Sequence, residues 1–140
     1  MGEAARLQAL HGYEVLDAPA DDELSAVVRA AAVVAGAPTA TLNLIDENRQ
    51  CQLTTVGFDG GDSARDDSMC AVVFASGRST HVPDARLDAR FAANPWVTSR
   101  AYPPAWQLCI LLVPRAPWSG ATSVIVVLPR RARAGWSCRA

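Results

Sequence analysis

The chain has 140 residues, which is room for one domain with a single core and too few for two. Half of its residues are hydrophobic and 19% are charged, a composition that excludes disordered and collagen-like chains. Its apolar runs fall far short of the roughly 20 residues that span a bilayer, and charged residues interrupt its first positions, so we expect a cytoplasmic protein with no secretory signal and no membrane contact. The net charge is −1, yet all 14 acidic residues precede position 99.

The first two predicted elements are helices. Residues 3–12 form a short helix with Leu7 and Leu10 on one face. Residues 13–19 connect it to a second helix, which begins after Asp21 because that carboxylate can accept from free amides of the first turn, and which ends at Gly36. The second helix carries apolar residues at helical spacing: Leu24, Val27, Val28, Ala31, Val34 and Ala35.

A β-hairpin is predicted next. Residues 39–45 are apolar and β-branched, residues 46–49 have turn chemistry, and residues 50–56 alternate as the partner strand. Residues 57–67 are rich in Gly and Asp and are expected to form a loop.

The remaining elements are short. A helix over 68–76, capped by Asp67 or Ser68, precedes a strand at 79–82 and a polar helical turn at 84–94 that carries Leu87 and Phe91 inward. Two apolar runs, 107–113 and 121–128, are joined by residues 114–120 and predict a further hairpin. Strands joined by hairpins, with helices between them, predict an α+β fold in which helices are layered on an antiparallel sheet.

The spacing of cysteines and histidines does not favour a metal site. No two of them have the close spacing that a zinc site uses, and the reduced thiols of a cytosolic chain are not expected to form disulfides. The residues concerned are Cys51, Cys70, Cys109, Cys138, His11 and His81.

Short sequence blocks over residues 3–98 occur in a characteristic order. They are Arg6-Leu7 with Leu10, Tyr13 to Asp17, Asp21 to Leu24, Leu44-Ile45-Asp46 with Arg49, Val56-Gly57, Arg65, Ser68-Met69-Cys70, Val82 to Asp88, and Arg90-Phe91 with Asn94-Pro95 and Val97. In this order they resemble the GAF domain, a small sensory module of bacterial signalling proteins. The resemblance implies one domain over residues 3–128, with a central antiparallel sheet of five or six strands and helices on one face.

The resemblance stops near position 99. Residues 99–140 hold six arginines and no acidic residue, together with three of the four Trp and five of the nine Pro. We hypothesise that this divergent Arg/Trp/Pro-rich tail comes from a shifted reading frame or a recent rearrangement. Its arginines are mostly scattered among apolar residues, so nucleic-acid binding is not expected. Its two apolar runs have the alternation needed to fill the missing strand positions.

A candidate ligand site also follows from the resemblance, because GAF domains bind small ligands between the sheet and helix-bearing loops. Phe58, Met69 and Phe74 have an ordinary alternative as core residues, and Cys70 is either a buried thiol or, in the first turn of a helix, a reactive one. The positions expected to line the pocket are Asn43, Phe58, Met69, Cys70, Phe74 and Asp84.

The resemblance implies a non-catalytic domain that binds an unidentified small molecule in bacterial signal transduction. It would act through a homodimer or a signalling partner such as a kinase, with no metal and with the cofactor left open. Two alternatives remain. One is an enzyme that reduces free methionine sulfoxide through Cys70, with Cys51 as its pair. The other is a structural or dimerisation module with an empty pocket.

Overall fold

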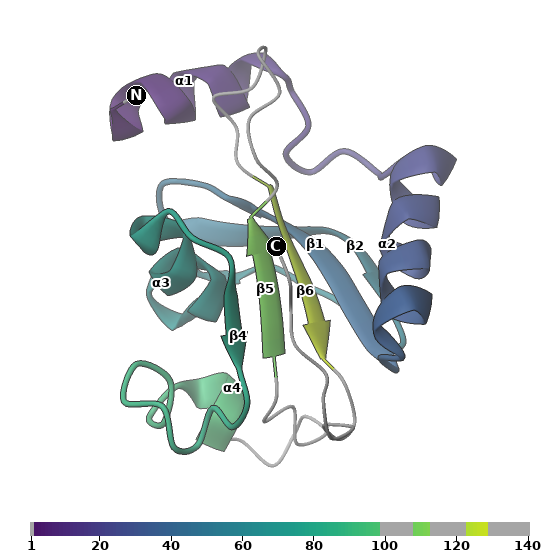
Figure 1. Ribbon diagram of the computed structural model, residues 1–140. Coiled ribbons are helices and arrows are strands. Elements are labelled where there is room, and N and C mark those ends of the chain that lie inside the picture. Colours follow the sequence, from purple (N-terminus) through teal and green to yellow (C-terminus); the bar gives the residue numbers. More distant parts are fainter. Residues whose placement is uncertain (1, 99–107, 113–122, 129–140) are drawn as a thin grey trace.

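The computed structural model describes residues 2–98, 108–112 and 123–128 of the chain (Figure 1). Its elements are the helices α1 (Glu3–Gly12), α2 (Asp22–Ala35), α3 (Met69–Ser76) and α4 (Pro95–Thr98), the 3-10 turn η1 (Arg65–Asp67), and the strands β1 (Thr39–Ile45), β2 (Arg49–Val56), β3 (Ser63–Ala64), β4 (Thr80–Val82), β5 (Leu108–Leu112) and β6 (Ser123–Leu128).

The strands form one six-stranded sheet in the order β3-β2-β1-β6-β5-β4, and each neighbouring pair is antiparallel. This arrangement confirms the predicted α+β fold. The two C-terminal runs that lie beyond the family-like blocks are both strands. They complete the sheet between β1 and β4, and β6 pairs with β1 from Thr39↔Leu128 to Leu44↔Ser123. The predicted connection 114–120 lies outside the described residues, and the domain limits 3–128 stay a prediction.

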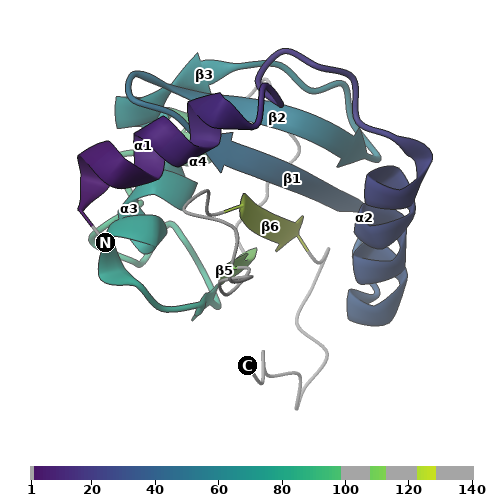
Figure 2. The same cartoon turned by 90° about the horizontal axis from the view of Figure 1, so that it is seen from above.

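Helices lie against both faces of this sheet (Figure 2), whereas the resemblance implied one face. The cause is β1, a strand in the middle of the sheet whose seven residues are all buried, so that alternate side chains need cover on opposite sides. Ala40 and Leu42 pack against Val28 of α2. Ile45 packs on the other side, against Val73 of α3.

The starts of α2 and α3 are set by local side-chain caps. The carboxylate of Asp21 accepts a 2.8 Å hydrogen bond from the Leu24 amide, and α2 ends at Gly36, whose φ of 60° suits a residue without a Cβ. For α3, Ser68 is the cap, since its hydroxyl accepts from the Ala71 amide at 3.0 Å. Of the two predicted cap candidates for α3, the structure therefore selects Ser68.

The exposed side of α2 is apolar as well. Val28 and Ala32 face the sheet, but Val34 is 87% exposed and Val27 is 51% exposed. Helical spacing alone grouped Val27 and Val34 with the core-facing residues. An apolar residue can lie on either side of such a helix, and packing on the sheet decides which side is buried.

Residues 84–94 form successive turns without a helix. Phe91 is fully buried there, as predicted, but Leu87 is 85% exposed, so the inward placement of Leu87 was wrong. The Asp84 and Asp88 carboxylates accept from the backbone amides of Arg86 and Arg90, which stabilises turns and not a continuous helix. The sequence also left β3, η1 and α4 unpredicted, all of which have four residues or fewer.

In the part of the chain that the structure describes, every helix is too short or too polar to cross a membrane.

Candidate functional site

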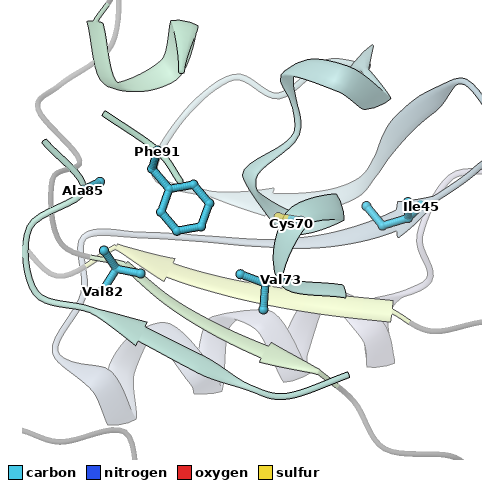
Figure 3. Close-up of a cluster of buried hydrophobic side chains, with 6 residues drawn as sticks. All are labelled: Ile45, Cys70, Val73, Val82, Ala85 and Phe91. Atoms are coloured by element: carbon cyan, nitrogen blue, oxygen red, sulfur yellow. The ribbon is translucent and has the colours of Figure 1, made fainter. Parts of the chain in front are cut away.

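Two of the predicted site residues form a buried contact between the sheet and α3. Asn43, on β1, is 1% exposed, and its Nδ2 donates to the Sγ of Cys70 at 3.3 Å. The Asn43 Oδ1 accepts from the Thr41 hydroxyl at 2.8 Å. Thr41 and Asn43 are therefore polar residues on the face of β1 that Ile45 shares, and Cys70 links them to an apolar cluster. Figure 3 shows that cluster, which consists of Ile45, Cys70, Val73, Val82, Ala85 and Phe91.

The polar contact continues from Cys70 toward the surface. The Ser68 side chain forms a hydrogen bond with Cys70, and the Ser68 hydroxyl donates to Gln50 Oε1 at 2.6 Å. The Gln50 Nε2 in turn donates to the Ser63 hydroxyl at 3.5 Å. Ser68 and Gln50 are buried, and Ser63 is half-buried on β3. A hydrogen-bonded chain therefore runs from Asn43 to the edge of the sheet, and we call it the polar chain.

Burial controls the chemistry of Cys70. It raises the pKa of the Cys70 thiol to about 11, against the opposing effect of its hydrogen bonds with Asn43 and Ser68. The thiol is therefore neutral near pH 7, which agrees with the buried alternative for this residue.

Cys51 and Cys70 lie against opposite faces of the sheet. Cys51 pairs with Leu44 in the hairpin and packs beside Leu10 of α1. Cys70 contacts Asn43, which directly precedes Leu44 on β1. Neighbouring side chains of a strand point to opposite faces, so Asn43 and Leu44 lie on different sides of the sheet. Both cysteines are free, and this placement separates the two thiols of the predicted dithiol alternative.

The other predicted site residues are dispersed. Met69 packs at the border of the Cys70 cluster. Phe74 faces α1, where the Arg6 guanidinium lies 4.8 Å from its ring centre. Phe58 is half-buried, and its carbonyl accepts from Thr55. Asp84 forms an ion pair with Arg86, which lowers the pKa of its carboxyl.

A surface hollow of about 350 Å³ opens beside the outer end of the polar chain. Among the described residues, its lining includes three acidic residues, Asp59, Asp62 and Asp67, together with Trp96, and no basic residue. Ser63 belongs both to this lining and to the polar chain. The residues that line the hollow are 59–64 with Asp67, Pro95 and Trp96. Sequence reasoning missed the hollow because α4 was not predicted, although the density of Gly and Asp over 57–67 marked one of its walls.

One cluster has the donor atoms of a metal site. The ligand atoms of Asp17, Cys51 and Asp62 lie within 4.8 Å of one another. The Arg49 guanidinium already binds both Asp17 oxygens, at 2.7 and 2.6 Å, and also pairs with Asp62. The two carboxylates of this cluster are therefore already paired with a cation of the protein itself.

Several residues of the family-like blocks serve to dock α1 on the hairpin. Arg6 donates to the Ile45 carbonyl at 2.7 Å and Arg65 to the Asp46 carbonyl at 2.8 Å. His11 Nε2 lies 2.7 Å from the Asp46 carboxylate. These contacts give the charged residues of the family-like blocks a structural role.

The fold and the site together define an α+β sheet domain with a polar-lined interior and an adjoining hollow. No protein-family profile matches the chain. Over 83 residues, or 59% of its length, the chain is 32% identical to a cyclic di-GMP phosphodiesterase of Pseudomonas aeruginosa, and the matched region is 14% of that protein. The chain is thus distantly similar to a small part of a bacterial signalling protein, which is consistent with signal transduction in general.

Proposed function

We propose that the chain is a GAF-type sensory domain that binds a small molecule without catalysis and acts in bacterial signal transduction through a partner, such as a kinase, or through a dimer. The similarity to a short part of a signalling phosphodiesterase supports an accessory role in such a system. Binding would act by shifting the population of a conformation that the partner recognises.

The observation that carries this proposal is the polar chain next to the hollow. Buried amides and hydroxyls are costly unless each is hydrogen-bonded, so a core retains them where they specify structure or recognition. Here they lead from Ser63, in the lining of the hollow, to the buried Asn43–Cys70 pair. A ligand seated in the hollow would contact the outer end of this chain.

The charge of the hollow favours some ligands over others. Asp59, Asp62 and Asp67 are all in its lining, and within the described part of the chain only Asp62 forms an ion pair with an arginine. The described lining is therefore acidic on balance, and an acidic lining repels phosphates and attracts ammonium groups. We therefore expect amines and amino acids to bind in preference to nucleotides.

The high pKa of Cys70 supports a non-catalytic role over sulfoxide reduction. A reducing cysteine attacks as the thiolate, and burial holds Cys70 as the thiol. The separation of Cys51 from Cys70 by the sheet also weakens the alternative that uses both.

A thermal-shift screen tests the proposal. The panel contains amines, amino acids, cyclic nucleotides and haem, and a compound that binds the folded state must raise the unfolding midpoint. Asp67→Asn should reduce the shift given by an ammonium compound, whereas Asp66→Asn, one residue outside the lining, should leave it unchanged. A panel without any shift, or an equal effect of both variants, contradicts the proposal.

A further inference from the structure

Arg49, the first residue of β2, holds two segments that are distant in sequence. Its two terminal nitrogens bind both carboxylate oxygens of Asp17, which belongs to the connection between α1 and α2. The same guanidinium pairs with Asp62, in the lining of the hollow. One cation therefore joins the α1–α2 connection to the loop between β2 and β3.

Each of these segments has a further anchor. In the connection, Asp17 adopts a φ of 64°, a backbone conformation that costs free energy for a residue with a Cβ and that its neighbours must maintain. The Asp17 amide also hydrogen-bonds the sulfur of Cys51. In the loop, the Gly61 amide donates to Gln52 at 2.8 Å.

The two carboxylates repel each other. The oxygens of Asp17 and Asp62 lie within 4.8 Å of one another, and the Arg49 charge between them makes that approach favourable. Both carboxylates accept a hydrogen bond from the same terminal nitrogen of Arg49, Nη1, and Asp17 also accepts one from Nη2, so the two carboxylates share a single cationic group. What remains between them is like-charge repulsion, which a change of charge at Asp62 would relieve.

We propose that Arg49 couples two sites: the charge of Asp62, at the hollow, controls the strength of the Arg49–Asp17 ion pair. That ion pair fixes the α1–α2 connection to β2. When Asp62 is neutralised, by substitution or by a cation in the hollow, Arg49 binds Asp17 more firmly and the connection becomes more rigid, while the longer 3.8 Å contact of Arg49 with Asp46 is unchanged. When Arg49 is lost, the two carboxylates repel and the connection opens. The coupling acts between groups of the chain itself and needs no ligand.

Asp62→Asn is the deciding variant because it keeps Arg49 in place. Hydrogen exchange of the Asp17 and Ala18 amides should slow by about twofold relative to the unmodified chain. Asp59→Asn, in the same loop but without a contact to Arg49 in the described structure, should leave that exchange unchanged. Equal exchange in the two variants, or faster exchange in Asp62→Asn, overturns the proposal.

Cysteine alkylation gives an independent readout, since Cys51 is buried beside these carboxylates. In Arg49→Gln, iodoacetamide should label Cys51 about tenfold faster, while labelling of Cys70 stays unchanged if the fold is intact. Adding Asp62→Asn to Arg49→Gln should recover part of the protection, because it removes the repulsion. No recovery in the double variant overturns the proposal, and if Arg49→Gln unfolds the chain, the exchange comparison of Asp62→Asn with Asp59→Asn decides.

Discussion

Phe91 and Leu87 are four residues apart in one polar segment, yet their environments are opposite. Phe91 is fully buried among Val82, Ala85 and the other residues of the α3-side core (Figure 3). Leu87 is exposed to solvent. The sequence placed both inward because a helical turn would bring them to one face, and the turns at Asp84 and Asp88 remove that periodicity.

Replacement of Phe91 by alanine should therefore be severe. Phe91→Ala removes a fully buried ring and should cost about 3–5 kcal/mol of unfolding free energy, measured by urea denaturation. Leu87→Ala is the control and should change the unfolding free energy by less than about 0.5 kcal/mol. A similar loss of unfolding free energy in both variants would contradict the finding that Phe91 is buried and Leu87 is exposed.

The candidate site was predictable only where a residue lies on a central element. Asn43 and Cys70 meet because β1 and the first turn of α3 are both buried. The Phe74 ring instead stacks with Arg6 of α1, which lies 68 positions earlier in the sequence. No local pattern predicts a contact of that kind.

At the scale of elements, charged contacts fasten α1 to the rest of the domain. Glu3 accepts hydrogen bonds from Arg6, and its Oε1 also accepts from Arg65 at 2.9 Å. These arginines lower the pKa of Glu3 from 4.5 to about 2, with the hydrogen bond from Arg6 as the largest cause. Because the pKa is lowered by folding, the ionised Glu3 contributes stability above pH 4.5 and loses that contribution as the pH falls toward 2.

Glu3→Gln should therefore make the stability of the fold less dependent on pH in the acidic range. Between pH 5 and pH 3, the urea midpoint of the unmodified chain should fall more than that of Glu3→Gln. Glu23→Gln, on the exposed first turn of α2, serves as the control and should keep the steeper fall. Parallel profiles for Glu3→Gln and the unmodified chain would show that the ion pairs of Glu3 do not stabilise the fold.

At the scale of the whole molecule, the sheet depends on its C-terminal strands. β6 lies between β1 and β5, so residues 123–128 pair with strands on both sides. Without β6, the buried strand β1 would become an exposed edge, which favours aggregation. The strands beyond position 99 are thus integral to the sheet, whatever the origin of their coding sequence.

A proline in β6 tests this dependence. Val126 pairs with Thr41 and Ile110, and Val126→Pro removes a backbone donor from the middle of the sheet, at a cost of about 3 kcal/mol or more. Val126→Thr keeps the donor and should cost clearly less. Circular dichroism during thermal unfolding measures both, and a small effect of the proline would contradict the central position of β6.

The sequence by itself determined the elements whose signals are local: the strand at 39–45, the capped second helix, and the apolar runs that became β5 and β6. Helix caps and the alternation of apolar residues depend on only a few neighbouring residues, so they can be recognised in the sequence without knowledge of the fold. The tertiary structure decided which faces are buried, where the hollow lies, and that Arg49 joins Asp17 to Asp62 across 32 and 13 positions of sequence. Those outcomes depend on contacts between distant segments, which exist only after the sheet has brought them together.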